Sequence, residues 1–313
     1  MEYILLLIGF VLLIKGADFF VDGASSVATR FKIPPLVIGL TVVSLGTSAP
    51  EAAISISAAM SGSASISLGN VVGSNMFNLL MVIGVSSAML PMVTDDSVLK
   101  RDMPVNMAAT ALLCLMIIDG ELGRAEALIL CAAFVFYLYV IVKNALAHPA
   151  PVNEKTKSRH PLIALAFIAG GLFGIIRGGD LVVENAKVIA ASFGMSETMI
   201  GLTIVAIGTS LPELVTSVVA ARKGESGIAM GNAVGSCLFN SLFILGTTGV
   251  ISPLSADSDL VFDFFLLAIV CVILFIFAAR SKSVGRAEGI ACIAIYAAYT
   301  VFIILRAYGI IVI

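Results

Sequence analysis

A long polar motif occurs twice in this chain. Residues 46–51 read Gly-Thr-Ser-Ala-Pro-Glu and residues 208–213 read Gly-Thr-Ser-Leu-Pro-Glu. The shift that carries residue 46 to residue 208, which we call the repeat offset, also aligns further residues without a gap: Asp18 with Asp180, Gly69-Asn70 with Gly231-Asn232, Gly73-Ser74 with Gly235-Ser236, Phe77-Asn78 with Phe239-Asn240, and Pro91 with Pro253. A constant offset over both halves indicates that the chain is an internal duplication.

Apolar runs fill almost the whole chain. Of its 313 residues 59% are hydrophobic and 12% are charged, whereas a soluble domain has about a quarter charged residues. A membrane-spanning helix needs about 20 apolar residues. Runs of this kind, separated by polar breaks, lie at about 2–29, 34–61, 66–91, 103–119, 124–146, 161–191, 196–221, 227–252, 260–279 and 287–306. We therefore expect an all-α membrane protein with ten transmembrane helices that contain its function.

Several other classes of protein are not indicated. The formal net charge is −2, so we expect no nucleic-acid partner. The five Cys lie in apolar stretches without CxxC spacing, which argues against a disulfide framework and against a zinc site. The spans contain no HExxH or GxSxG motif, so we expect neither an enzyme nor a bound cofactor.

The positions of Lys and Arg predict the orientation. Thirteen of the 18 lie in alternate loops: Arg30, Lys32, Lys100, Arg101, Lys143, Lys155, Lys157, Arg159, Arg222, Lys223, Arg280, Lys282 and Arg286. Because positively charged loops stay in the cytoplasm, both termini are expected outside.

Each half contains five of the predicted spans, and this odd number turns the second half upside down in the membrane. We predict a first five-helix repeat at 1–146, a cytoplasmic linker at 147–160 and an inverted second repeat at 161–313. Inverted repeats with interrupted helices that meet at the midplane are typical of secondary transporters.

Two acidic residues lie near the centres of the second and seventh spans. Glu51 and Glu213 have no Lys or Arg nearby in the sequence. A charged residue at that depth costs roughly 2.5–3.5 kcal/mol on the insertion scale. Pro50 and Pro212, one residue earlier, interrupt the helices and free backbone carbonyls. A protonated structural carboxyl is the alternative, but the recurrence of both features favours a functional pair.

Polar side chains accompany each glutamate at helical spacing. In the second span, Glu51 shares a helix face with Ser44, Thr47 and Ser48. In the seventh span, Glu213 shares a face with Ala206, Thr209 and Ser210. The third and eighth spans offer an opposing polar face: Asn70, Ser74 and Asn78, and Asn232, Ser236 and Asn240. Hydroxyls, amide and backbone carbonyls and carboxylates form an all-oxygen site, which suits Na⁺ or Ca²⁺.

Charge balance then predicts a mechanism. Two ionised glutamates are neutralised by one Ca²⁺ or by two or three Na⁺, and a bare site would be costly. If the repeats reorient only when the site is neutral, the two ions exclude each other and exchange results. Two protons would also neutralise the pair, so an H⁺-coupled Ca²⁺ or cation exchanger is the alternative. A passive cation channel is less favoured, because a channel favours a continuous pore and oligomeric symmetry.

Two further charged pairs lie inside the first and sixth spans. Lys15 and Asp18, and likewise Arg177 and Asp180, are three residues apart and therefore share a helix face. We expect each to be a local, self-neutralising ion pair. A role in gating is the alternative, because these helices precede the site helices.

The duplicated motif resembles the alpha-repeats of the cation/Ca²⁺ exchanger superfamily, in particular its prokaryotic Na⁺/Ca²⁺ exchangers. The resemblance covers the whole chain, with the motifs at 39–84 and 201–246. It implies an antiporter in the plasma (inner) membrane that works as a monomer in the lipid bilayer. It also implies that the first and sixth helices slide as a gating pair against the other eight.

The resemblance also implies roles for single residues. Glu51 and Glu213 would be the central Ca²⁺ ligands. The flanking positions would complete the shells of Ca²⁺ and Na⁺: Thr47, Thr209, Ser48, Ser210, Ser74, Ser236, and the carbonyls near Ser44 and Ala206. Asn78 and Asn240 are both amides, whereas potassium-dependent relatives have Asp at the second position, so the sequence argues against K⁺ cotransport. Cys237 aligns with Asn75, which makes the two half-sites chemically unequal.

Overall fold

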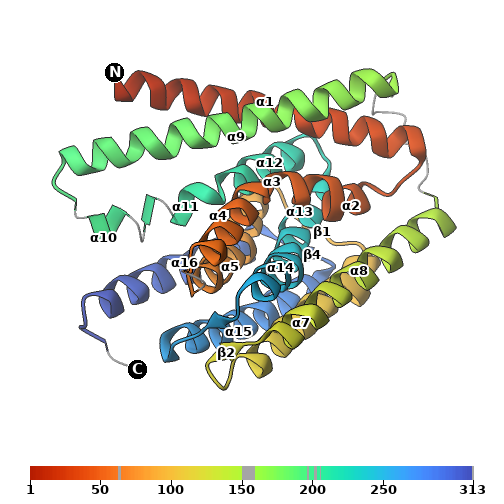
Figure 1. Ribbon diagram of the computed structural model, residues 1–313. Coiled ribbons are helices and arrows are strands. Elements are labelled where there is room, and N and C mark those ends of the chain that lie inside the picture. Colours follow the sequence, from red (N-terminus) through yellow and green to blue (C-terminus); the bar gives the residue numbers. More distant parts are fainter. Residues whose placement is uncertain (63–64, 150–158, 196, 201–202, 205, 312–313) are drawn as a thin grey trace.

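The computed structural model describes residues 1–62, 65–149, 159–195, 197–200, 203–204 and 206–311. The expected linker residues Lys155 and Lys157, and Gly201 and Leu202 of the second motif, lie outside this part. Two long helices, α1 (Glu2–Phe31) and α9 (Pro161–Ser192), lie side by side across one face of the remaining helices (Figure 1). The N-terminus and the end of the last helix lie on the same side of the molecule.

Small residues allow α1 and α9 to pack backbone against backbone. A Cβ added at Gly171 would lie 2.5 Å from the Phe20 nitrogen, and one added at Gly178 would lie 2.5 Å from the Leu13 nitrogen. Close approach of this kind is the usual way in which helices associate in lipid. The two helices are therefore fixed to each other more closely than to the rest of the molecule.

Two composite helices form the interior. The first is α5 (Ser65–Phe77), η2 (Asn78–Val82) and α6 (Ile83–Met89), and the second is α13 (Ser226–Leu238), η5 (Phe239–Ile244) and α14 (Leu245–Ile251). In each, 78% of the residues in the most apolar stretch are buried, against 11–33% in the other long helices described. The middle segments η2 and η5 are π-helices, which widen a helix locally and occur frequently at functional sites.

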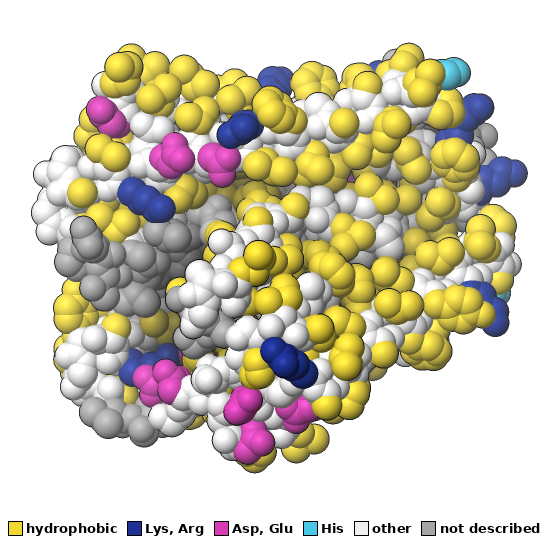
Figure 2. Space-filling view, viewed as in Figure 1, with side chains coloured by type: hydrophobic (Ala, Val, Ile, Leu, Met, Phe, Trp, Pro, Cys, Tyr) yellow, Lys and Arg dark blue, Asp and Glu magenta, His cyan; other side chains and the backbone are white. Residues whose placement is uncertain are grey.

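The remaining elements surround these two helices. In chain order they are α2 (Pro35–Ile38), η1 (Gly39–Val43), α3 (Ser44–Thr47), α4 (Ala49–Met60), η3 (Val98–Asp102), α7 (Met103–Met116), α8 (Arg124–Ala147), α10 (Glu197–Ile200), α11 (Ala206–Thr209), α12 (Leu211–Arg222), α15 (Ser258–Ser281) and α16 (Arg286–Ala307). Their outward sides are rich in exposed apolar residues, and hydrophobic side chains cover most of the face in Figure 2.

Both proline-containing helices are interrupted, as the sequence predicts. The helical segment Pro35–Thr47 and helix α4 are bent by 50° relative to each other. Ser48, between them, has φ −86° and ψ 8°, and Ser210, between α11 and α12, has φ −96° and ψ 8°. Pro50 and Pro212 then lie in the first turn of the next helix, where a missing N–H breaks no helical hydrogen bond.

Fewer than ten helices qualify as membrane spans within the described part of the chain. Within the described residues, seven helices are long and apolar enough to cross a membrane, or eight if the bent pair counts as one span. Helix α7 has only 14 residues, and the span expected at 196–221 includes residues outside the described part.

Two short antiparallel strand pairs tie loops of the two halves together. Strand β1 (Met92–Val93) pairs with β4 (Ser283–Val284), and β2 (Glu121–Leu122) pairs with β3 (Leu254–Ser255). The repeat offset maps β1 onto β3 and β2 onto β4. Each half thus contributes one strand to each pair.

Candidate cation-binding site

The two glutamates begin the helices that follow the breaks. Glu51 lies in the first turn of α4 and Glu213 in the first turn of α12. Their side chains are buried, with exposed fractions of 1% and 0%. The partial positive charge at a helix N-terminus favours a carboxylate there, so the break itself helps to hold an anion inside the molecule.

The serine at each break bonds to the glutamate of the other half. Ser48 Oγ donates to Glu213 Oε1 over 2.7 Å, and Ser210 Oγ donates to Glu51 Oε1 over 3.3 Å. These two bonds connect residues 165 and 159 positions apart in the chain. The four residues, which the sequence places in separate halves, therefore form one cluster.

One oxygen of each carboxyl group is left for another partner. Among the described residues, Glu51 Oε2 and Glu213 Oε2 are buried and have no hydrogen-bond partner. No described Lys or Arg forms an ion pair with either glutamate. Two buried acids without a protein counter-charge are suited to binding cations.

The side chains around the two glutamates offer oxygen atoms as ligands for a metal ion. The described residues include no group of three or more His, Cys, Asp and Glu side chains arranged for a metal. The neighbours of the two acids are instead hydroxyls and amides, and both Thr47 and Ser236 adjoin the Glu213 carboxyl. An oxygen-only set of this kind suits hard cations such as Na⁺ and Ca²⁺.

The opposing residues of η2, α5, α13 and η5 are buried as well. Asn78, Asn240, Ser74 and Ser236 have exposed fractions between 0% and 3%. Within the described part, Asn78 Oδ1, Asn240 Oδ1 and Ser236 Oγ have no hydrogen-bond partner. The π-helical turns at Asn78 and Asn240 place these amides in the interior, where free carbonyl oxygens are rare.

Asn70 and Asn232 use their amide nitrogens to bond to the backbone beside the glutamates. The sequence suggests that they supply carbonyl oxygens, but the Asn70 amide nitrogen donates to the Glu51 backbone carbonyl over 3.2 Å. Asn232 makes the equivalent bond to the Glu213 carbonyl, also over 3.2 Å, and its Oδ1 accepts from Thr47 Oγ1 over 3.0 Å. The two amides therefore position the backbone that carries the glutamates.

Two further expected site residues, Ser44 and Ala206, begin the short helices that precede the breaks. Ser44 is buried, but its hydroxyl donates to the Leu40 carbonyl of its own helix over 2.9 Å. Ala206 begins α11, and its side chain lies outside the described part. Only the backbone carbonyls of these two positions therefore remain as expected ligands.

Asn75 is a residue of the cluster region to which the sequence assigned no role. Its amide nitrogen donates to Ser241 Oγ over 2.8 Å and its Oδ1 accepts from Asn240 Nδ2 over 3.1 Å. These bonds join α5 to η5 across the two halves. The only hint in the sequence was that the repeat offset aligns Asn75 with Cys237. An amide is therefore present at this position in the first half and absent from it in the second half.

A pocket leads from the surface toward the site. It has a volume of about 200 Å³ and is lined by Pro50, Thr209 and Pro212, and by Asp180 and Glu184 of α9. In the upper half of Figure 2, acidic and basic side chains gather over α1 and α9 on a face that is otherwise mainly hydrophobic. Because Pro50 and Pro212 immediately precede the two glutamates in the chain, the pocket lies next to the cluster.

The chain is similar to known proteins over most of its length. The family model described as "Sodium/calcium exchanger protein" matches residues 1–143 and 163–305. The chain is 40% identical over 257 residues to "Putative antiporter CaxA" of Alkalimonas amylolytica, covering 80% of this chain and 81% of that protein. It is 32% identical over 342 residues to "Sodium/calcium exchanger MaX1" of Methanosarcina acetivorans, covering 96% and 97%.

A solved structure shows the same fold. The sodium-calcium exchanger NCX_Mj, soaked with zero Na⁺ and Ca²⁺, superposes with a TM-score of 0.83 at 32% identity, covering 95% of this chain and 96% of that chain. The family model spans both halves of the chain, including both break motifs. The chain therefore belongs to the sodium/calcium exchanger family and is a secondary active antiporter, not an enzyme.

Proposed function

We propose that this antiporter exchanges Na⁺ for Ca²⁺ at the cluster formed by Glu51, Glu213, Ser48 and Ser210. The observation that supports this best is the pair of reciprocal serine–glutamate bonds, which leaves one buried oxygen of each carboxyl group without a protein partner. The names of MaX1 and NCX_Mj describe those proteins as sodium/calcium exchangers.

Within this cluster we assign the ligands as follows. Glu51 and Glu213, together with Thr47 and Thr209, bind Ca²⁺ at the centre. Flanking Na⁺ sites use the hydroxyls and amides around them and two backbone carbonyls: Ser48, Ser210, Ser74, Ser236, Asn78, Asn240, and the carbonyls at Ser44 and Ala206. A serine hydroxyl that donates its hydrogen to a carboxylate keeps two lone pairs, so Ser48 and Ser210 serve both a glutamate and a cation.

The exchange follows from the charge of the pair. Two ionised carboxylates in a region without water are stable only when cations neutralise them. One Ca²⁺ or a set of Na⁺ does this, and the two loads compete for Glu51 and Glu213. A site that reorients only when loaded then couples the entry of one ion to the exit of the other.

For the membrane arrangement we propose ten helices in two inverted repeats, 1–146 and 161–313, with a linker at 147–160. Three features support this: the constant offset, the similar breaks at Ser48 and Ser210, and the bonds between the two halves. The distribution of Lys and Arg among the loops supports an orientation in which both termini lie outside the plasma (inner) membrane. Since one chain provides both half-sites, a monomer is sufficient for exchange.

Na⁺-driven flux into sealed vesicles tests this function. Ca²⁺ uptake by the reconstituted protein is expected to require an opposed Na⁺ gradient and to saturate with Ca²⁺. Uptake that ignores Na⁺ and follows a pH gradient would instead identify an H⁺-coupled exchanger, because two protons also neutralise the pair. Uptake that neither saturates nor needs a gradient would identify a passive channel, and either result would overturn the proposal.

A further inference from the structure

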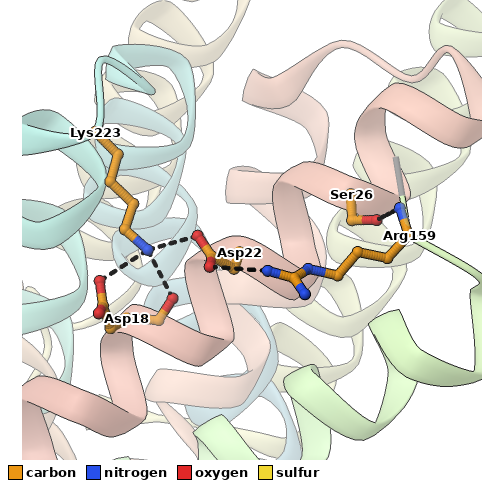
Figure 3. A network of polar contacts seen from close by, with 5 residues as sticks. All are labelled: Asp18, Asp22, Ser26, Arg159 and Lys223. Carbon is orange, nitrogen blue, oxygen red and sulfur yellow. Dashed lines mark hydrogen bonds and ion pairs between the residues drawn. The ribbon is translucent and has the colours of Figure 1, made fainter. Parts of the chain in front are cut away.

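Helix α1 is tied to the end of α12 by ion pairs, which Figure 3 shows in detail. The Lys223 ammonium lies 2.8 Å from Asp18 Oδ1 and 2.5 Å from Asp22 Oδ1, and it also donates to the Asp18 backbone carbonyl over 2.8 Å. Lys223 directly follows α12, the helix that begins with Glu213 in its first turn. A single lysine thus connects α1 to the helix of the cation site.

A second cation connects the beginning of α9 to the same acid. The Arg159 guanidinium lies 3.5 Å from Asp22 Oδ2, and the Arg159 backbone N–H donates to Ser26 Oγ over 2.8 Å. Asp22 therefore bonds to one cation from the α12 end and to one that precedes α9. We call Asp18, Asp22, Arg159 and Lys223 the α1 network.

The α1 network differs from the expected local pair. The spacing of Lys15 and Asp18 predicted an ion pair within α1. Among the described residues, Asp18 instead pairs with Lys223, 205 positions later in the chain. A local pair would stay within α1, whereas the observed pair adds a link between α1 and the end of α12.

The opposite end of α9 has the equivalent acids without the equivalent lysine. The repeat offset maps Asp18 and Asp22 onto Asp180 and Glu184, which line the pocket beside the site prolines. It maps Lys223 onto Ser61, which has no charge. Asp180 pairs with Arg177 of its own helix at 4.0 Å. At a rise of 1.5 Å per residue, Asp180 and Glu184 lie about 28 and 35 Å along α9 from its first residue, Pro161. The proposed membrane arrangement puts them toward the outer side.

We propose that the α1 network is a one-sided lock, which holds the α1–α9 pair against the core at the cytoplasmic side and so favours the state in which the site is reached through the pocket. The inference rests on the proposed function and on the expectation that α1 and α9 move as a pair against the other helices. The side chains of the network have exposed fractions between 29% and 44%, so each ion pair is weak and can open in every transport cycle. If the state open to one side of the membrane is rarely populated, the apparent Ca²⁺ affinity measured from that side is lowered.

Lys223→Gln tests the lock because it removes the charge that links the end of α12 to Asp18 and Asp22 of α1. In vesicles of known orientation, the apparent Ca²⁺ affinity is expected to rise at the cytoplasmic face and to fall at the outer face, each by about two- to fivefold. Asp22→Asn is expected to act in the same direction, and Lys223→Arg, which keeps the charge, is expected to resemble the original chain.

Lys282→Gln is the matched control. Lys282 Nζ lies 2.7 Å from Asp96 Oδ1, another exposed pair in the cytoplasmic loops, but this pair does not involve α1 or α9. Hydrogen bonds from Lys100 and Lys282 lower the pKa of Asp96 to about 2, so the control pair stays ionised at the pH of the assay. Loss of the Lys282–Asp96 ion pair is expected to leave the apparent Ca²⁺ affinity unchanged at both faces of the membrane.

A labelling experiment separates the lock from the exchange activity. Val183 lines the pocket, and the thiol of a Val183→Cys variant is expected to react more slowly with an external water-soluble reagent when Lys223→Gln is added. If the affinities at both faces stay unchanged or fall together, or if the labelling rate is unaffected, the lock is wrong. If the original chain shows no Na⁺-dependent Ca²⁺ flux, the proposed function fails, and the labelling rate alone then decides on the lock.

Discussion

At the scale of single residues, the site is defined by contacts that cross between the two halves. Ser48 bonds to Glu213 and Ser210 to Glu51, so neither half can form its site alone. The two bonds are unequal, at 2.7 Å and 3.3 Å. A shorter bond to a carboxylate is the stronger one, so the two half-sites are expected to differ in how firmly their glutamate is held.

Substitution of each serine by alanine tests this difference. Ser48→Ala is expected to lower the apparent Ca²⁺ affinity by about 10- to 100-fold, because a hydrogen bond to a charged group contributes about 1.5–3 kcal/mol. Ser210→Ala is expected to lower it less, because its bond is longer. Ca²⁺ titration of uptake in vesicles measures both. Equal losses, or a larger loss in Ser210→Ala, would contradict the unequal geometry.

Ser192→Ala is a suitable control for the serine variants. Ser192 is exposed at the end of α9, and its hydroxyl donates to the Ile189 carbonyl of the same helix over 2.6 Å. Its removal deletes a hydroxyl without touching the site, so the Ca²⁺ affinity is expected to stay the same.

Sequence reasoning selected residues that the structure brings together, but it did not predict how they bond to one another. The cost of burying an acid pointed to Glu51 and Glu213, and helical spacing placed Ser48 and Ser210 beside them. The exchange of partners between halves depends on how the halves pack, which no local spacing encodes. The role of Asn70 was missed for a related reason, because an amide has both a donor and an acceptor, and only the position of the Glu51 carbonyl decides which end faces it.

At the scale of elements, breaks in the helices create the site. The prolines predicted the interruptions at Ser48 and Ser210, because a proline cannot continue the hydrogen-bond ladder. The π-helical turns at Asn78 and Asn240 were not predicted. They leave no mark in the sequence comparable to proline, since an extra residue in a helical turn is stabilised by its tertiary surroundings.

The close contact between α1 and α9 predicts that a larger residue at Gly171 destabilises the fold. Gly171→Ala is expected to lower the midpoint of thermal unfolding in detergent by several degrees, because the added Cβ would lie 2.5 Å from the Phe20 nitrogen and 2.7 Å from the Gly16 carbonyl oxygen. Overpacking of this kind costs typically about 1–3 kcal/mol.

The neighbouring glycine supplies the comparison for that experiment. A Cβ added at Gly170 meets nothing within 4 Å, so Gly170→Ala is expected to keep the midpoint or to raise it through its better helix propensity. If both variants unfold at the same temperature, the close backbone packing of α1 and α9 does not stabilise the fold.

At the scale of the whole molecule, two similar halves surround one site but are not equivalent at its two sides. The repeat offset relates the breaks, the strands and the acids Asp18 and Asp180. It does not relate Lys223 to another cation, since Ser61 takes that position. The duplication could be found from the sequence alone, whereas the partner of Asp18 could not, because it depends on where the end of α12 lies against α1.

The central claim is that two buried glutamates bind Ca²⁺ and Na⁺ in competition. Equilibrium binding of radioactive Ca²⁺ to the purified protein, with and without Na⁺, tests it most directly. The original chain is expected to bind Ca²⁺ saturably and to release it as Na⁺ is added. Glu51→Gln and Glu213→Gln are each expected to weaken Ca²⁺ binding at least about tenfold while the protein stays folded, since an amide has nearly the same shape but no charge. Glu121→Gln, on an exposed strand, is expected to bind normally. Unchanged Ca²⁺ binding in either site variant, or binding in the original chain that Na⁺ does not displace, would contradict the claim.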